Sequence, residues 1–327
     1  MPTYDLPLDE LRRYAPALSE PADFDDFWAE TLALARSHEL AVELEPFDSG
    51  LVAVRTWNVT FGGFDGHRVH AWLHLPALSS ARLPAVVQFQ GYGGGRGLAH
   101  ESILWAAAGY AHLVVDTRGQ GSGWSTGDTA DPVGSPPAHP GFMTQGILDP
   151  RGYYYRRVFV DCVRAVDVLR THEAVEPSRI AVTGGSQGGG MALAVAGLTP
   201  DIFAALPDVP FLCDFPRAIA ITPKAPYTEI THYLKVHRDH AARVFETLSY
   251  FDCVTLGRRA SAPALFSVGL MDEITPPSTV FAAYNAYGGP KSVIVYEYNE
   301  HEGGGPFHQQ AQVRWLRELL AGGLAGG

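Results

Sequence analysis

The chain has 327 residues, of which 46% are hydrophobic and 18% are charged, and its formal net charge is -11. Lys and Arg form no cluster, so the composition excludes the electrostatic footprint of a nucleic-acid-binding protein. No run approaches the roughly 20 apolar residues of a membrane span, and the first ten residues lack the basic and apolar regions of a signal peptide. Three scattered cysteines (Cys162, Cys213 and Cys253) favour reduced, buried thiols over disulfides or a metal site. We therefore expect a globular, cytoplasmic protein with no membrane partner.

The first predicted elements are a helical segment and a hairpin. Residues 5 to 45 are expected to be helical, with Asp23 or Asp25 as a cap before an apolar-periodic run. Alternating residues at 56–61 and 67–75, separated by a glycine-containing segment, predict an antiparallel hairpin.

Further along the chain the pattern changes to short apolar runs that alternate with helical segments. The runs, rich in β-branched residues, lie at 85–90, 112–116, 179–183, 264–268 and 293–298. Helical spacing occurs at 101–108, 154–169 and 189–198. Buried strands that alternate with helices predict an α/β fold with a mostly parallel sheet, helices on both faces and the hairpin at its edge.

We interpret residues 1–327 as a single domain with one insertion. Residues 212 to 256 are predicted to be helical, carry much of the charge, and interrupt the alternation between two strands. An insertion at that place is expected to form a cap or an assembly surface.

The central motif is Gly184-Gly185-Ser186-Gln187-Gly188. As a bare pattern Gly-x-Ser-x-Gly is weak in a chain with 35 glycines, and the alternative is a glycine-rich turn. Here it follows a predicted strand directly and opens a predicted helix, which is the context of a nucleophile elbow. The sequence therefore predicts Ser186 as a nucleophile of the α/β-hydrolase type.

A serine hydroxyl needs a base and an orienting acid, which in this fold follow in the order Ser, Asp or Glu, His, each after a later strand. Asp272 follows the run 264–268, and His301 follows the next run. Glu273 is the alternative acid, and His308 is the competing base, although it lies behind three glycines where the last helix should begin.

An oxyanion hole needs two N–H donors, one from the residue after the nucleophile and one from a loop after an early strand. Gln187 and Tyr92 have these positions, the latter in the glycine-rich segment 91–95, whose alternative interpretation is a flexible loop. Four further residues are expected to bind substrate or support the site: Gly91, Arg118, Gln120 and Trp124.

Two other patterns carry less weight. Gly119, Gly121 and Gly123 have the wrong spacing for a dinucleotide fingerprint. Three histidines (His232, His237 and His240) lack a carboxylate or cysteine frame, so a solvated helix face is favoured over a metal site. No metal or organic cofactor is expected.

In combination, Arg118-Gly119-Gln120, the motif 184–188 and His301-Glu302 resemble the signature of carbohydrate esterase family 7, the acetyl xylan esterases and cephalosporin-C deacetylases. The likeness extends over almost the whole chain and includes the segments 24–28, 146–150, 153–157 and 208–212.

The resemblance implies a cytoplasmic deacetylase of acetylated xylo-oligosaccharides, cephalosporin C and small acetate esters. It also implies a homo-hexamer, a trimer of dimers whose active sites face an internal chamber. Carried over by matching position, the triad is Ser186, Asp272 and His301, the oxyanion donors are Tyr92 and Gln187, and the Arg118 motif has a structural role.

Two rival functions remain. A carboxylesterase or serine peptidase of the same fold would use the same triad, although the bulky Tyr92 beside the nucleophile favours a small acyl group. A catalytically inactive binding module would be expected to lack a triad member, whereas all three positions are filled.

Overall fold

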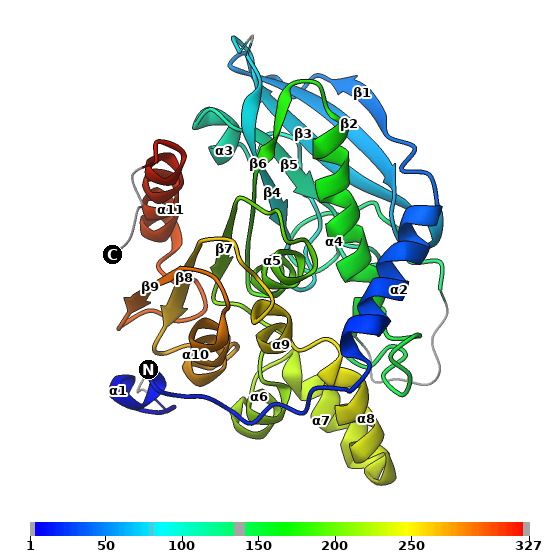
Figure 1. Cartoon of the computed structure of the whole chain (residues 1–327), viewed down its shortest axis with the longest axis vertical. Coiled ribbons are helices and arrows are strands. Elements are labelled where there is room, and N and C mark those ends of the chain that lie inside the picture. Colours follow the sequence, from blue (N-terminus) through cyan, green and yellow to red (C-terminus); the bar gives the residue numbers. More distant parts are fainter. Residues whose placement is uncertain (1–3, 80, 134–140, 323–327) are drawn as a thin grey trace.

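The computed structural model describes residues 4–79, 81–133 and 141–322, and its centre is a nine-stranded sheet (Figure 1). The strands lie in the order β1-β2-β3-β5-β4-β6-β7-β8-β9. Their bounds are β1 Glu43–Phe47, β2 Val54–Gly62, β3 Arg68–Pro76, β4 Leu83–Phe89, β5 Ala111–Val115, β6 Val175–Gly185, β7 Ala204–Asp208, β8 Ala264–Gly269 and β9 Lys291–Tyr296. From β5 through β9 all neighbours pair in parallel, which confirms the predicted mostly parallel α/β sheet.

The N-terminal strands form the antiparallel part of the sheet. β2 and β3 make the predicted hairpin around the short 3-10 helix η1 (Phe64–Gly66), and β3 pairs antiparallel with β5. The hairpin is not the edge, however, because β1 pairs outside β2. All five residues of β1 are exposed, and its short alternation of Leu44 with Glu43 and Glu45 falls within the segment predicted to be helical.

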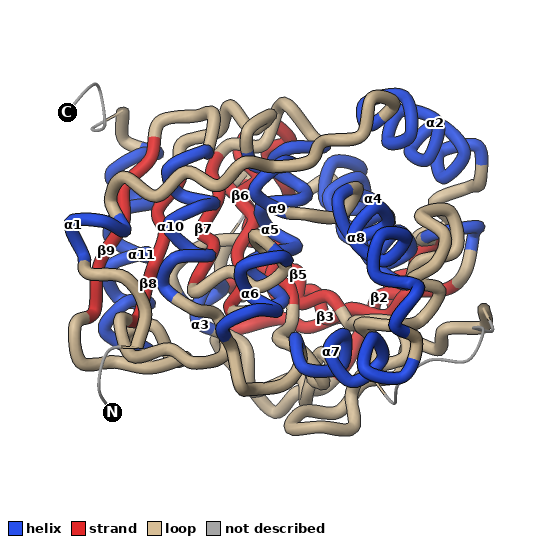
Figure 2. Tube along the Cα trace, turned by 90° about the horizontal axis from the view of Figure 1, so that it is seen from below, coloured by secondary structure: helices blue, strands red, loops and turns tan. Residues whose placement is uncertain are grey.

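The prediction of a helix over residues 5 to 45 is wrong for most of its length. The segment contains α1 (Leu8–Leu11) and α2 (Phe24–Ser37), and residues 12–23 between them form no helix. Pro16 and Pro21 stand in this connection, and proline lacks the N–H that a helix interior requires. Figure 2 shows α1 beside α10 at one end of the sheet and α2 beside α4 at the other, so this connection runs along the molecule.

Helices cover both faces of the sheet, as predicted. On one face lie α3 (Leu104–Ala107) and α11 (Gly305–Leu320), which pack against Val86, Ala181, Leu206 and Leu265. On the other face lie α4 (Tyr154–Thr171), α5 (Gln187–Leu198) and α10 (Pro277–Ala286), which pack with Val87, Val182 and Phe266. The two groups of strand residues alternate, so each strand contributes to two cores.

The segment between β7 and β8 is helical, as the sequence predicts. It contains α6 (Phe215–Ile221), α7 (Tyr227–Val236), the 3-10 helix η2 (Arg238–His240), α8 (Ala241–Ser249) and α9 (Cys253–Gly257). Figure 1 shows α6, α7 and α8 grouped at one end of the molecule, with α9 packed on α5. We call residues 212–256 the insertion.

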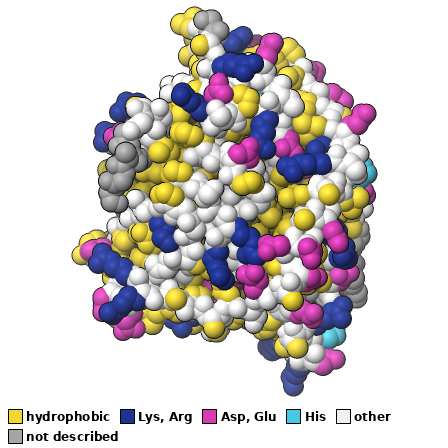
Figure 3. All heavy atoms as spheres, in the orientation of Figure 1, with side chains coloured by type: hydrophobic (Ala, Val, Ile, Leu, Met, Phe, Trp, Pro, Cys, Tyr) yellow, Lys and Arg dark blue, Asp and Glu magenta, His cyan; other side chains and the backbone are white. Residues whose placement is uncertain are grey.

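The surface in Figure 3 has Lys and Arg side chains scattered among Asp and Glu side chains, with apolar side chains between them. Among the described residues, no helix combines the length and the apolar character needed to cross a membrane.

Candidate active site

Ser186 lies in a strained turn between β6 and α5. Its φ of 58° and ψ of -119° place it in a region that L-residues rarely adopt. The flanking glycines allow this turn, because a Cβ on Gly184 would lie 2.5 Å from the Gly188 backbone, and one on Gly188 would lie 2.4 Å from the carbonyl oxygen of Phe89. The geometry is that of a nucleophile elbow, as predicted from the motif.

Asp272 and His301 form a hydrogen-bonded pair. His301 Nδ1 lies 2.8 Å from Asp272 Oδ2, and the aspartate side chain is completely buried whereas that of the histidine is 28% exposed. The remaining acceptor sites of Asp272 are occupied by the backbone N–H groups of Ile274 and Thr275 and by the Thr275 hydroxyl. These donors fix the position of the carboxylate, which in turn holds the imidazole in a fixed orientation.

The two competing residues have other partners. The Glu273 side chain pairs with Lys224 at 3.5 Å. His308, on α11, is 1% exposed and contacts Asp208 and Tyr296. Neither residue takes part in the Asp272–His301 pair.

A cavity of about 680 Å³ at the carboxyl ends of the strands is lined by five of the nine predicted site residues. Ser186 and His301 both line it, together with Gly91, Tyr92 and Trp124. In the described part of the chain, no direct hydrogen bond joins the Ser186 hydroxyl to the His301 ring. The described wall includes three carboxylates (Glu101, Asp208 and Glu302) and no Lys or Arg.

The two predicted oxyanion donors are available. Within the described ranges, neither the Tyr92 nor the Gln187 backbone N–H has a hydrogen-bond acceptor. Gln187 is the first residue of α5, so its N–H belongs to the unpaired first turn, where the helix dipole favours negative charge. The arrangement can therefore stabilise an anion that forms at Ser186.

The Gln120 side chain connects the glycine-rich loop that carries Tyr92 with the turn that carries Gln187. Its Oε1 accepts a hydrogen bond from the Gly93 N–H at 2.7 Å, and its Nε2 donates to Gln187 Oε1 at 2.9 Å. The Gln187 side chain also donates to the Gln90 carbonyl oxygen at 3.2 Å. One buried amide thus fixes the glycine-rich loop against the elbow, which is the supporting role predicted for the motif.

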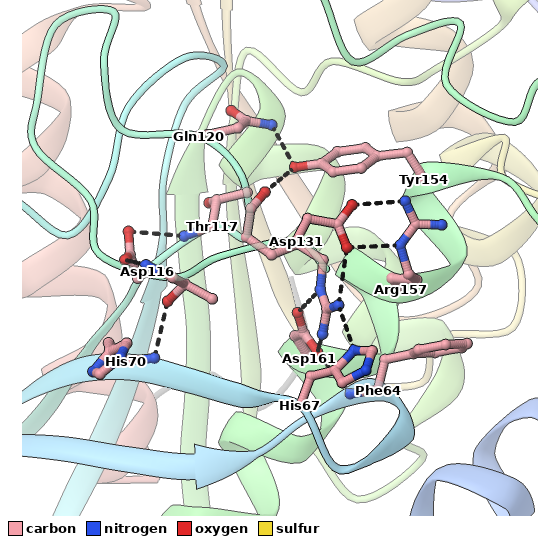
Figure 4. Close-up of polar contacts among 12 residues, drawn as sticks. Phe64, His67, His70, Asp116, Thr117, Gln120, Asp131, Tyr154, Arg157 and Asp161 are labelled. Atoms are coloured by element: carbon pink, nitrogen blue, oxygen red, sulfur yellow. Dashed lines mark hydrogen bonds and ion pairs between the residues drawn. The ribbon is translucent and has the colours of Figure 1, made fainter. Parts of the chain in front are cut away.

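Arg118 lies outside the cavity wall and is 1% exposed. It makes a bidentate pair with Asp161 at 2.6 and 2.7 Å and contacts Asp131, which also pairs with Arg157 at 2.7 Å. Burial lowers the pKa of Arg118, but the two carboxylates outweigh it and the net shift is upward. Figure 4 shows this cluster next to the contact between Tyr154 and Gln120. Arg118 therefore positions the loop that carries Gln120.

Trp124 covers the glycine-rich loop from outside. Its indole Nε1 donates to the Tyr92 carbonyl oxygen at 2.9 Å, and 64% of the residue is exposed. A Cβ on Gly94 would lie 2.3 Å from the indole ring, and one on Gly91 would lie 3.3 Å from it. The glycines are needed so that this ring can lie against the backbone of the oxyanion loop.

No sequence motif indicates Glu229, which holds the Tyr92 side chain. The Tyr92 hydroxyl donates to Glu229 Oε1 at 2.7 Å and accepts from the Phe142 N–H at 2.7 Å, while Glu229 Oε2 accepts from the Met143 N–H at 3.0 Å. Burial and the neighbouring carboxylate raise the pKa of Tyr92 well above its usual range. Glu229 lies on α7 in the insertion, 137 residues from Tyr92 in sequence, so no local motif could connect the two.

The described residues contain no group of three or more His, Cys, Asp or Glu placed to hold a metal ion. The His237 and His240 rings are stacked 5.0 Å apart, and the Tyr233 hydroxyl contacts His240 Nδ1. All three cysteines are buried free thiols, and burial raises the pKa of each.

Comparison with known proteins agrees with this geometry. The acetyl xylan esterase (AXE1) family model matches residues 1–319. The solved acetyl xylan esterase from Paenibacillus sp. R4 is 41% identical and superposes with a TM-score of 0.91 over 95% of this chain and 99% of that chain. The one from Thermoanaerobacterium sp. JW/SL YS485 is 32% identical, with a TM-score of 0.87 over 97% of this chain and 99% of that chain.

Two further relatives are more distant. Acetyl esterase Axe7A of Xylanibacter ruminicola is 26% identical over 301 residues, which are 88% of this chain, and the chain spans only 64% of that protein's length. The α/β hydrolase GrgF from Penicillium sp. sh18, at 17% identity and a TM-score of 0.56, covers 81% of this chain and 99% of its own and shares the fold alone.

The chain has the α/β-hydrolase fold, belongs to the acetyl xylan esterase family, and is thereby a carboxylic ester hydrolase.

Proposed function

We propose that the protein removes acetyl groups from acetylated xylo-oligosaccharides, cephalosporin C and small acetate esters through an acetyl-serine intermediate. The observation that carries the proposal is the Asp272–His301 hydrogen bond of 2.8 Å behind a cavity that His301 shares with the strained Ser186. The names of the similar solved structures support the substrate class, and the strained turn at Ser186 with the Asp272–His301 pair supports the serine mechanism.

In the first step His301 takes the Ser186 proton while the serine oxygen attacks the acetyl carbonyl carbon. The Tyr92 and Gln187 N–H groups hold the oxyanion that forms. His301 then protonates the departing alcohol oxygen, which leaves the acetyl group on Ser186.

In the second step His301 activates a water molecule, which attacks the acetyl-serine and releases acetate. Asp272 keeps the His301 Nδ1 proton in place and stabilises the imidazolium in both steps. The bulky Tyr92 beside Ser186 favours an acyl group as small as acetyl.

Replacement of the nucleophile tests this proposal. In Ser186→Ala we expect the burst of nitrophenol from nitrophenyl acetate to disappear while circular dichroism and the melting temperature stay unchanged, because only one partly exposed hydroxyl oxygen at the cavity wall is lost. Ser37→Ala, which removes an exposed hydroxyl on α2, is the control and should keep the full burst. Near-normal turnover in Ser186→Ala would refute the assignment, as would a fluorophosphonate probe that labels another residue.

The cytoplasmic location and the homo-hexamer belong to the same proposal and rest on the family resemblance. Light scattering of the purified protein tests the assembly: a mass six times that of the chain supports the hexamer, and a monomer mass refutes it. Cell fractionation tests the location.

A further inference from the structure

The strand residues on the α3/α11 face change from apolar to polar at the point where the cavity begins. Deeper in the sheet this face carries Val86, Ala181 and Leu206, which lie in the core beneath α3 and α11. Two residues further along the same strands stand Gln88, Thr183 and Asp208, and all three line the cavity. Since side chains alternate along a strand, each pair points to the same face. The wall of the cavity on this side is therefore polar, although the layer beneath it is apolar.

Asp208 is the charged member of this wall and lies next to the nucleophile. It pairs with Gly185 across β6 and β7, and its carbonyl oxygen accepts the Ser186 N–H at 2.9 Å. Its Oδ1 accepts a hydrogen bond from Gln312 Nε2 at 2.7 Å and lies 2.9 Å from His308 Nε2. Both of these α11 residues are almost completely buried, and His308 Nδ1 lies 3.1 Å from the Tyr296 hydroxyl.

The other carboxylate oxygen of Asp208 is unoccupied. Among the described residues Oδ2 has no hydrogen-bond partner, and 22% of the side chain is exposed. Because Gln312 donates a hydrogen bond to Oδ1, which also lies 2.9 Å from His308 Nε2, the carboxylate cannot turn without losing that hydrogen bond. A fixed anionic acceptor thus stands in the cavity wall, and neither Ser186 nor His301 uses it.

The alcohol half of the ester must lie on this side of the nucleophile. His301 has to reach the departing alcohol oxygen, and the chain runs from His301 through Gly303 into α11, whose residues His308, Gln309 and Gln312 line the same cavity. A carboxylate accepts hydrogen bonds and donates none, so its natural partner on a neutral alcohol is a free hydroxyl. Its position beside Ser186 suits a hydroxyl on the carbon next to the acylated one.

We infer that Asp208, held by Gln312 and His308, binds a free hydroxyl vicinal to the ester, so that the site selects monoacetates of vicinal diols such as those in a pyranose ring. This inference rests on the proposed deacetylase function and adds to it the recognition of the alcohol half. Asp208 is a binding residue and takes no part in proton transfer.

The test compares two esters that differ by one hydroxyl, trans-2-hydroxycyclohexyl acetate and cyclohexyl acetate. A hydrogen bond to a charged group is worth roughly 1.5–3 kcal/mol, so the wild-type kcat/KM should favour the hydroxy ester by about tenfold or more. In Asp208→Asn, Gln312 and the His308 contact retain the amide oxygen at the Oδ1 position, so an NH2 group replaces the acceptor in the cavity. We expect the preference to fall to about twofold or less, because kcat/KM should fall much more for the hydroxy ester than for cyclohexyl acetate.

Glu101→Gln is the matched control, because Glu101 is another carboxylate of the cavity wall and its Oε2 accepts the Leu98 N–H. This variant should keep the wild-type preference. The inference is overturned if Asp208→Asn keeps the preference, if it lowers kcat/KM for both esters alike, or if the wild type shows no preference. Failure of the proposed function has a different signature: the wild type then hydrolyses neither ester, and a fluorophosphonate does not label Ser186.

Discussion

At the scale of single residues, the proposed oxyanion hole depends on side chains that are not among its donors. The Tyr92 N–H is positioned from two directions, because Gln120 fixes the neighbouring Gly93 and Glu229 fixes the Tyr92 hydroxyl. Interactions with the oxyanion are strongest in the transition state, so small displacements of the donor affect kcat more than substrate binding.

Glu229→Gln is therefore expected to lower kcat for nitrophenyl acetate about tenfold and to leave KM nearly unchanged, since loss of a whole oxyanion donor costs roughly 10²–10³ in kcat. The amide keeps the size of the side chain, but an NH2 group then faces either the Met143 N–H or the Tyr92 hydroxyl, and one of these contacts is lost. The value of kcat from steady-state kinetics should fall together with the affinity for a trifluoromethyl ketone, which mimics the tetrahedral intermediate.

Tyr287→Phe is the control for this variant. It removes a buried hydroxyl that donates to the Ala262 carbonyl oxygen at 2.8 Å, and it is not part of the cavity wall. It should lower the melting temperature slightly and leave kcat unchanged. A Glu229→Gln protein that loses only thermal stability, or whose KM rises at constant kcat, would show that Glu229 does not position the hole.

At the scale of elements, the pairing of β3 with β5 buries two histidines opposite each other. His74 and His112 are register partners, and both are completely buried. Burial lowers the pKa of His74 from 6.5 to about 4, and burial together with the neighbouring His74 lowers the pKa of His112 well below its ordinary value. The folded protein therefore keeps both rings neutral over a pH range in which the unfolded chain takes up protons.

This pairing predicts that stability falls as the pH is lowered. Below the ordinary pKa of 6.5 the unfolded state binds a proton at His74 that the folded state does not bind until about pH 4, so stability is complete above 6.5 and is lost as the pH falls. Between about pH 7.5 and about pH 5 this one group costs about 2 kcal/mol of unfolding free energy. Urea denaturation of His74→Gln should show a pH-dependent loss smaller by that amount.

His100→Gln, which removes an exposed histidine, serves as the reference and should lose stability with pH as the wild type does. If His74→Gln and the wild type lose equal unfolding free energy as the pH is lowered, His74 is protonated in the folded protein over the same pH range as in the unfolded chain.

At the scale of the whole molecule, the order of strands along the chain predicted which residues meet at the edge of the sheet. It did not predict the contacts that the insertion makes with them. In a parallel sheet the carboxyl ends of strands meet at one edge, so Ser186, Asp272 and His301 could be placed by their positions after successive strands. The exposed β1 and the short β7 were not predicted from the sequence. β7 reads Ala-Ala-Leu-Pro-Asp and has no β-branched residues. Glu229 reaches Tyr92 only through the packing of the insertion, which no local spacing encodes.

The charge of the cavity wall has a consequence for the end of the catalytic cycle. An acetylated xylo-oligosaccharide or simple acetate ester enters as a neutral molecule, but acetate leaves as an anion from a wall that carries Glu101, Asp208 and Glu302 and, among the described residues, no Lys or Arg. Like charges repel most strongly where water is partly excluded, so the product should rebind weakly. If the proposed hydrolysis is correct, sodium acetate should inhibit initial rates hardly more than sodium chloride at the same ionic strength, and strong competition by acetate would contradict this. Asp208, which is proposed to bind the alcohol half, would then also contribute to the departure of the acid.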